Sequence, residues 1–298
     1  MWPFFHPIPE VMSSSKKPHK LVSGPRSHAK DMGDLLRANA RTHRLDTVFS
    51  DFCEVSALSF SNAVDPIHRD AREKRYLEIV AKYQPEEITR FCQALAVLVE
   101  WLSLGMCDAL GDLFMSLELG ERGKGQFFTP YPVSSLMARM TAGDVKEQLK
   151  QQDHIALNEP ACGAGGMVIA YAEAMLDQDV NYQHYLHATL QDIDSTAVHM
   201  AYVQLSLLHV PAIVIHGNSL AMTEWAHWVT PAHVLGGWDK RLYFPRAVRA
   251  MREVLSMPAT EDLVSSPQEV SVPPAPTPIA ESATQYVVNQ RREQLALF

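Results

Sequence analysis

The chain has 298 residues, a net charge of −8 and a hydrophobic content of 47%. This length is enough for one core of ordinary domain size or two smaller ones. The mild acidity argues against a protein that coats nucleic acid through charge alone, but it is compatible with a locally basic surface. The four cysteines are far apart and form neither a C-x-x-C pair nor a zinc-spaced cluster, so we expect reduced thiols.

The first residues lack the features of a secretory signal. They read M-W-P-F-F-H-P, with prolines where a signal peptide needs an apolar helix and with no basic residues in front. No apolar run reaches the length of about 20 residues that a membrane-spanning helix needs. The sequence therefore predicts a protein with no membrane segment, located in the cytoplasm.

A flexible tail and a helical domain are predicted for the first part of the chain. Residues 1–30 are rich in Pro, Ser, Lys and His, and this basic tail could contact a phosphate backbone or simply be solvated. Residues 31–122 have a helical pattern. Within it, Pro85-Glu86-Glu87 suits a first helical turn, and an amphipathic run follows at residues 105–118.

An α/β domain is predicted over residues 123–256. Short apolar runs at 155–157, 188–190 and 212–215 alternate with helical segments at 168–176 and 196–208. This alternation is typical of the start of a doubly wound parallel sheet. A turn-rich stretch with three tryptophans and a helix near 244–256 are expected next. The composition of residues 257–298 predicts a disordered tail.

The first predicted strand leads into a glycine-rich turn, N-E-P-A-C-G-A-G-G-M, at residues 158–167. Glycine allows a positive φ and a close approach of a ligand to the backbone, and the helix that follows offers free N–H groups. In open parallel sheets, ligands bind beyond the carboxyl ends of the strands, where the chain order reverses, and Asp192 ends the second strand. A purely structural turn is the alternative, because the spacing matches neither G-x-G-x-x-G nor a P-loop.

Two segments in this order resemble the N6-adenine DNA methyltransferases. E-P-A-C-G-A-G-G-M at residues 159–167 resembles their S-adenosylmethionine-binding turn, and G-Q-F-F-T-P-Y-P-V at 125–133 resembles their G-Q-F/Y-Y/F-T-P-x-x-V segment. The stretch D-A-L-G-D-L-F-M-S-L-E-L at 108–119 resembles the helix before it. The resemblance is to the modification subunit of type I restriction–modification systems, over roughly residues 85–220.

The resemblance implies a shortened, Rossmann-like S-adenosylmethionine-dependent methyltransferase domain of α/β fold, with an N-terminal helical domain. It also implies S-adenosyl-L-methionine as cofactor and DNA as partner. Segment 126–130 should line the methionine and adenine side of the cofactor, although its two phenylalanines could instead be core residues.

Individual residues receive roles from the same resemblance. Glu159 should lie near the cofactor's ammonium group, and the backbone at 164–166 should contact its amino-acid end. Asp192 should accept hydrogen bonds from the ribose hydroxyls, and Ile193 should pack on the adenine. Asn218 replaces an Asp of the family; its amide can bind an adenine edge or shape a turn. The cofactor-binding residues predicted are Gln126, Phe127, Phe128, Thr129, Pro130, Glu159, Ala161, Gly163, Ala164, Gly165, Gly166, Asp192, Ile193 and Asn218.

One motif of the family is absent. Its members carry N-P-P-F/Y after the fourth strand, where the Asn and a proline carbonyl align the target N6 and the aromatic ring stacks on the flipped base. The sequence contains no N-P-P-F, N-P-P-Y or D-P-P-Y. The nearest substitute, Thr230-Pro231-Ala232-His233, is poor, and Trp228 or Trp238 could stack on a base. The catalytic residues are therefore unknown from the sequence.

Three functions are compatible with these features. The leading hypothesis is methylation of adenine N6 in DNA, site-specific and of restriction–modification type, with help from a second methyltransferase or a specificity subunit. The second is a non-catalytic module that binds cofactor, DNA or a replication clamp in regulation or antirestriction. The third, a small-molecule methyltransferase, is disfavoured by the Q-F-F-T-P segment.

The last five residues resemble the Q-L-x-L-F peptide by which bacterial replication and repair proteins bind the sliding clamp. A mobile linker would present two leucines and a phenylalanine to an apolar groove. A tail with chance hydrophobic residues is the alternative. The residues that would bind are Gln294, Leu295, Leu297 and Phe298.

Overall fold

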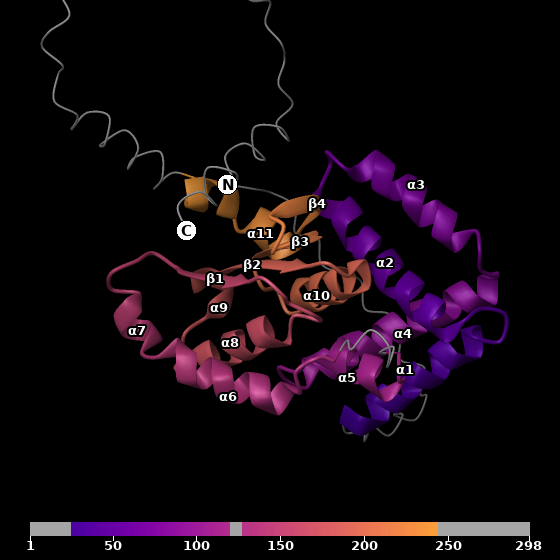
Figure 1. Ribbon diagram of the computed structural model, residues 1–298, viewed down its shortest axis with the longest axis horizontal. Helices are drawn as coiled ribbons and strands as arrows, with labels where there is room; N and C mark the ends of the chain where they lie inside the picture. Colours follow the sequence, from indigo (N-terminus) through magenta and orange to yellow (C-terminus); the bar gives the residue numbers. More distant parts are fainter. Residues whose placement is uncertain (1–24, 120–126, 244–298) are drawn as a thin grey trace, which may run out of the picture. The chain divides into compact units, whose positions relative to one another are not determined.

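The computed structural model describes residues 25–119 and 127–243. These residues form a helical region followed by a four-stranded sheet with helices against it (Figure 1). The predicted α/β fold with an N-terminal helical region is confirmed. No described helix is long and apolar enough to cross a membrane. Several predictions concern residues outside the described ranges, namely most of the basic tail, Gln126, the helix near 244–256, the disordered tail and the clamp-binding peptide.

Five helices make up the helical region. α1 packs against α4, and α2 packs against α3. α1 starts at Pro25, so the tail boundary predicted at residue 30 falls inside a helix. The bounds are α1 Pro25–Asn39, α2 Leu45–Val64, α3 Arg69–Val80, α4 Pro85–Ser103 and α5 Ala109–Ser116.

The start of α4 shows why this part of the sequence is helical. Pro85 occupies the first helical position, where its missing N–H is not needed. The Glu87 carboxylate accepts a hydrogen bond from the backbone N–H of Gln84 at 2.8 Å, which completes a capping box. Phe91 and Leu98 on one face are buried, as their helical spacing predicts.

The sheet has the order β1-β2-β3-β4. The first three strands are parallel, with Ile155 opposite Leu186 and Ala188 opposite Ala212. The strand–helix–strand–helix–strand prediction is confirmed, while β4, antiparallel to β3, was not predicted. The bounds are β1 Ile155–Glu159, α8 Gly166–Leu176, α9 Tyr182–Tyr185, β2 Leu186–Asp192, α10 Ser195–Leu207, β3 Ala212–Asn218, β4 Thr223–Val229 and α11 Pro231–Leu235.

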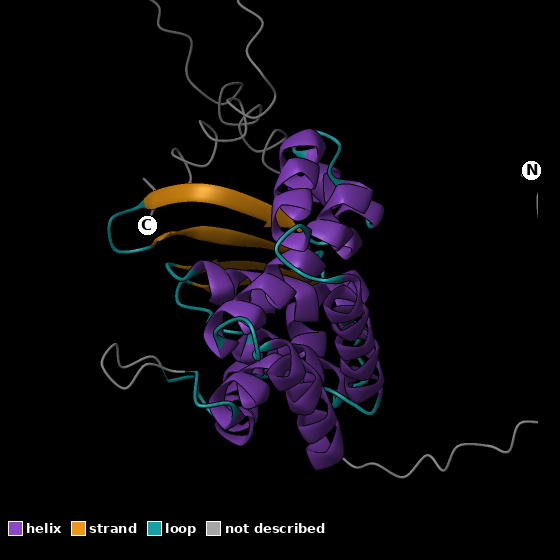
Figure 2. Cartoon of the chain, turned by 90° about the vertical axis from the view of Figure 1, so that its right-hand side faces the viewer, coloured by secondary structure: helices purple, strands orange, loops and turns teal. Residues whose placement is uncertain are grey.

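A row of helices covers one face of this sheet. α10 packs on β2 and β3, α8 packs on β1, and α6 (Tyr131–Ala142) packs along α8 (Figure 1). The short α7 (Val145–Gln148) follows α6. α10 also packs against α2, which joins the helical region to the sheet. Figure 2 shows the strands as one layer with most helices gathered on one side of it.

The position of β1 differs from the expectation for a ligand site in a doubly wound sheet. The sequence-based argument placed the ligand where the strand order reverses. Within the described residues β1 is an edge strand, and the order runs in one direction from β1 to β4. The glycine turn therefore lies at the edge of the described sheet, because the strand that should flank β1 on its other side is not among the described strands.

Candidate functional site

The glycine turn connects β1 to α8 in a conformation that needs glycine. Gly163 has φ +53° and Gly165, which caps α8, has φ +90°. A Cβ on Gly163 would lie 2.8 Å from the ring of Phe128. The backbone N–H of Cys162 donates to the carbonyl of Gln191 at 2.9 Å, so the turn reaches across to the end of β2. These contacts fix the turn beside the carboxyl ends of two strands.

Two half-buried carboxylates, those of Glu159 and Asp192, lie at the carboxyl ends of β1 and β2. The Asp192 Oδ2 accepts a hydrogen bond from the backbone N–H of Gly163 at 2.8 Å, and its Oδ1 accepts one from Asp194 at 2.9 Å. Burial raises the pKa of Glu159, and the negative charge of Asp192 adds to this effect. Neither carboxylate has an ion-pair partner among the described residues. The pair therefore suits a ligand that carries positive charge and hydroxyl donors.

The other predicted cofactor residues differ in their surroundings. Phe128 packs against Phe114 with ring centroids 5.0 Å apart, so it has both the core role and a place beside the turn. Phe127 is 71% exposed. Ile193 is 59% exposed directly after Asp192, and its outer surface is accessible. The remaining described members of the predicted set are Thr129, Pro130, Ala161, Ala164, Gly166 and Asn218.

Asn218 shapes a turn in this structure. Its side-chain oxygen accepts hydrogen bonds from the backbone N–H groups of Leu220 and Ala221, each at 3.0 Å. This is the alternative that the sequence left open, and it accounts for an amide at the end of β3. The side-chain oxygen is occupied by the turn, so a role of Asn218 in binding an adenine edge would depend on its amide nitrogen.

Asp108 and Gln204 are two residues of the site that the sequence analysis did not identify. The Gln204 Nε2 donates to Asp108 at 2.9 Å and to the carbonyl of Ala164 in the glycine turn at 2.9 Å. Its oxygen accepts the backbone N–H of Leu110 at 2.9 Å. Asp108 also caps α5 through the N–H of Gly111. Burial raises the pKa of Asp108 to about 6. The helical region is thus linked to the turn through the side chain of Gln204 on α10.

The segment suspected of replacing N-P-P-F/Y lies at the wrong end of the sheet. Thr230 caps α11, and its hydroxyl accepts the backbone N–H of Ala212 at 2.9 Å, at the amino end of β3. The glycine turn lies at the carboxyl ends of β1 and β2. Because the three strands are parallel, Thr230 and the turn lie at opposite ends of these strands. Thr230-Pro231-Ala232-His233 therefore does not belong to the candidate site.

The two tryptophans suspected of stacking on a base are core residues. Trp228 is buried against Tyr202, with ring centroids 5.4 Å apart. Trp238 is fully buried and packs on His187 at 5.2 Å. Among the tryptophans in the described ranges, the exposed one is Trp225 on β4, whose ring centroid lies 4.8 Å from that of His216 near the carboxyl end of β3. This rim position could not be derived from the sequence without knowledge of β4.

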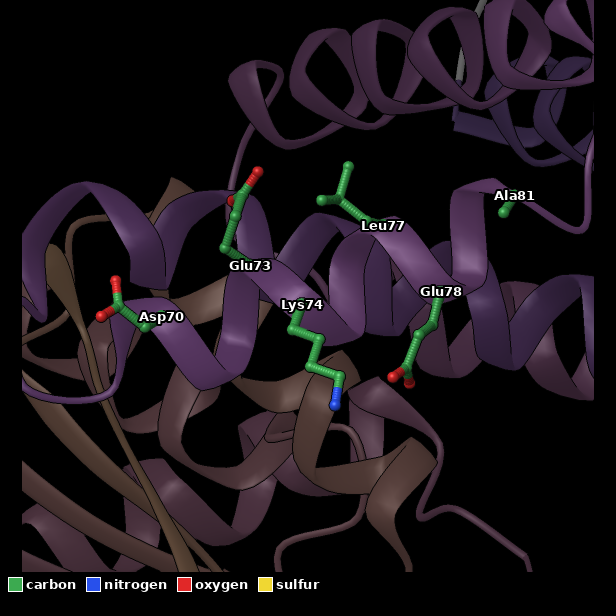
Figure 3. Close-up of a pocket in the computed structure, with 6 residues that line it drawn as sticks. All are labelled: Asp70, Glu73, Lys74, Leu77, Glu78 and Ala81. Atoms are coloured by element: carbon green, nitrogen blue, oxygen red, sulfur yellow. The ribbon is translucent and has the colours of Figure 1, made fainter.

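A shallow depression on α3 has no connection with this site. Figure 3 shows its lining residues along one helix, with carboxylates on either side of a lysine. A solvated helix face has this character, so we assign no function to it. The lining residues are Asp70, Glu73, Lys74, Leu77, Glu78 and Ala81.

Comparison with known proteins found one matching family model and a similar solved structure. Residues 111–235 match the family described as N-6 DNA methylase. No curated protein matches the chain. One similar solved structure is a protein from Listeria monocytogenes described as a class I S-adenosylmethionine-dependent methyltransferase, with 15% identity and a TM-score of 0.38. The match covers 66% of this chain and 55% of that chain, so it spans about half of the solved protein.

The described α/β part is therefore a methyltransferase-class domain. Residues 111–235 match the N-6 DNA methylase family, and the resemblance seen in the motifs is confirmed for this segment. S-adenosyl-L-methionine is the cofactor that this family implies.

The residues at the turn fit this cofactor. S-adenosylmethionine carries a positively charged ammonium and a sulfonium, together with two ribose hydroxyl donors. Glu159 and Asp192 supply two negative charges at the ends of adjacent strands, and burial, together with the charge of Asp192, raises the pKa of Glu159. The absence of a Cβ at Gly163 lets the ring of Phe128 pack directly against the turn. The two carboxylates match the cofactor in charge and in their capacity to accept hydrogen bonds.

Proposed function

We propose that this chain is the cofactor-binding half of a DNA methyltransferase that acts on adenine N6. The carrying observation is the convergence of the glycine turn, Glu159 and Asp192 at the carboxyl ends of β1 and β2. The site-specific activity would be of restriction–modification type, in the cytoplasm, and would need a second methyltransferase or specificity subunit.

The roles of this chain's residues in the proposed reaction are binding and orientation. Glu159 pairs with the ammonium group, and Asp192 uses its remaining lone pairs to accept hydrogen bonds from ribose hydroxyls. When bound, the cofactor supplies a methyl group that leaves sulfur for N6, which loses a proton as S-adenosylhomocysteine forms. No described residue is assigned to hold the target base, because the segment considered as a substitute for N-P-P-F/Y lies at the opposite ends of the strands.

A non-catalytic role is the second candidate. It is favoured by one observation: the 298 residues contain no N-P-P-F/Y. Such a protein would bind cofactor and DNA, or a sliding clamp through its last residues, and would act in regulation. For the clamp, a fluorescent peptide of residues 285–298 titrated with purified clamp should saturate; no saturation below millimolar clamp would exclude this partner.

Cofactor binding is the first test. Asp192→Ala should weaken binding of S-adenosylmethionine by about 1–3 kcal/mol, because it removes charge-assisted hydrogen bonds and the acceptor that holds Gly163. Asp194→Ala is the matched control: this carboxylate caps α10 through Thr196 and Ala197, so its loss should reduce stability and leave affinity nearly unchanged. Calorimetry with both variants measures the difference. Equal affinity for wild type and Asp192→Ala would reject this site.

Genomic methylation distinguishes the two candidates. Modified-base sequencing of cells with and without the gene and its neighbours should reveal a new N6-methyladenine motif that Gly165→Asp abolishes. An aspartate at φ +90° is strained, so this change disrupts the turn. If no new motif is found while calorimetry still detects cofactor binding, the non-catalytic role is favoured.

A further inference from the structure

The helices α6 and α8 pack along each other and are joined by two polar contacts (Figure 1). At the start of α6, the Glu173 Oε2 on α8 accepts hydrogen bonds from the hydroxyls of Tyr131 and Ser135, each at 3.1 Å. About two turns further along α6, the Arg139 guanidinium pairs with Asp177 at 2.8 Å. The first contact is partly buried, whereas both partners of the second are exposed.

The first contact directly follows the segment 127–130. This segment has no regular secondary structure and leads into α6, which has no side-chain cap at its start. Among the described residues, no backbone hydrogen bond ties residues 127–129 to another element. The position of the segment therefore depends on side chains in it and next to it.

Phe128 and Tyr131 are the side chains that anchor the segment. The Phe128 ring packs on Phe114 and lies so close to Gly163 that a Cβ there would be 2.8 Å from the ring. Burial, and after it the charge of Glu173, raise the pKa of Tyr131, so its hydroxyl keeps the proton that it donates. Phe128 thus joins the segment to the glycine turn, and Tyr131 joins it to the helix that follows this turn.

The anchored segment borders the candidate cofactor site. The backbone N–H of Gly163 donates to Asp192 at 2.8 Å, and the Phe128 ring lies against the same glycine. The other three residues of the segment are exposed. A ligand held by the turn and by Asp192 therefore has this segment as a neighbour.

We propose that Tyr131 and Glu173 are positioning residues of the cofactor site, whose hydrogen bond fixes residues 127–130 against the glycine turn before the cofactor binds. A segment that is fixed in advance does not have to be ordered on binding, and this raises the affinity. The inference rests on the proposed function, because the ligand concerned is the cofactor of that reaction.

Hydrogen exchange in the cofactor-free protein tests the anchor. The N–H groups of residues 127–129 are followed by mass spectrometry in wild type, Tyr131→Phe and Glu173→Ala. Both variants should exchange these groups about threefold to tenfold faster, because local opening then breaks one hydrogen bond fewer. Asp177→Asn is the matched control: it removes the second contact between the same helices and should leave this exchange unchanged. Equal exchange in wild type and both variants would overturn the proposal.

Calorimetry with S-adenosylmethionine tests the effect on the site. Tyr131→Phe should weaken binding by about threefold to tenfold, which corresponds to the loss of one hydrogen bond. Glu173→Gln keeps an oxygen that can accept from Tyr131, so it should bind within about twofold of wild type. Asp177→Asn should also bind within about twofold. Equal weakening by Tyr131→Phe and Asp177→Asn would mean that only the general packing of the two helices matters, and would reject a positioning role.

The two measurements separate this inference from the proposed function. If wild type fails to bind S-adenosylmethionine, the proposed function is wrong, and hydrogen exchange alone decides whether the anchor exists. If wild type binds and Tyr131→Phe binds equally well, the positioning role is wrong even when the segment of the variant exchanges faster.

Discussion

The β4 edge and the β1 edge of the same sheet differ in what covers them. At β4, the Arg72 guanidinium on α3 donates to the carbonyl of His227 at 2.6 Å and lies 4.3 Å from the centroid of the Trp228 ring. Asp65 holds the same guanidinium at 2.6 Å. At β1, no described residue covers the strand in the way that Arg72 covers β4. The helix α6 exposes Leu136, Met137 and Met140 to solvent.

This difference indicates which edge is complete within the described part of the chain. An edge closed by a buried arginine is a permanent part of the fold, because removing its partner leaves a charge unpaired. The edge at β1, where the strand carries neither lysine nor proline and α6 exposes apolar side chains, is open to pairing with another strand. Arg72→Ala and a pair of lysine substitutions test this contrast, and Asp108→Asn tests the contact between the helical region and the glycine turn.

Arg72→Ala should have the largest effect on stability. The change leaves Asp65 without its buried partner and the His227 carbonyl without its donor, at a cost of about 3–5 kcal/mol. Urea denaturation measures the loss. Arg75→Ala on the same helix is the control; its pair with Glu54 involves an arginine side chain that is 44% exposed, so about 0–1 kcal/mol is expected. Similar losses for both variants would show that the β4 edge is not held by Arg72.

Asp108→Asn should have a smaller effect that depends on pH. Burial raises the folded-state pKa of Asp108 from 3.8 to about 6, so its protonated form favours folding and this contribution is lost as pH rises toward 6 and beyond. An amide does not ionise and can still accept from Gly111 and Gln204. The stability of the variant relative to wild type should therefore grow by about 1 kcal/mol between pH 5 and 7. A constant difference across this range in urea titrations would contradict the raised pKa.

Lysine substitutions at two alanines compare the edges directly. Ala156→Lys on β1 should change the free energy of unfolding by at most about 0.5 kcal/mol, because this side chain is exposed. Ala226→Lys on β4 should cost about 1–3 kcal/mol, because the side chain is half-buried within the covered edge. Equal losses in thermal unfolding would mean that the β1 edge is already covered in the isolated chain.

The sequence predicted the parts of the fold whose hydrophobic pattern is local. The runs at 155–157, 188–190 and 212–215 became β1, β2 and β3, because apolar residues in short runs bounded by turns suit buried parallel strands. β4 was missed: its T-E-W-A-H-W-V sequence mixes polar and aromatic residues, and only pairing with β3 makes it a strand. The place of β1 at an edge depends on strand order, which the local pattern does not contain.

The candidate site was predictable only where adjacent residues form it. The glycine turn and Asp192 were identified through their motif and strand ends. Asp108 and Gln204 were not, because 96 residues separate the two partners of one hydrogen bond and no local pattern pairs them. Asp108 could have been suspected as a helix cap in D-A-L-G-D, but its contact with the turn depends on tertiary packing.

The two hydrogen bonds from Gln204 to Asp108 and to the Ala164 carbonyl have a consequence for truncations and domain fusions of this protein. The domain boundary predicted after residue 122 falls between Asp108 and the turn that it helps to hold. A fragment starting at residue 123 would keep every glycine of the turn and lose the carboxylate that anchors Gln204. The helical region and the turn are therefore structurally dependent on each other, and a gene fusion at this boundary would carry the glycine turn without its support.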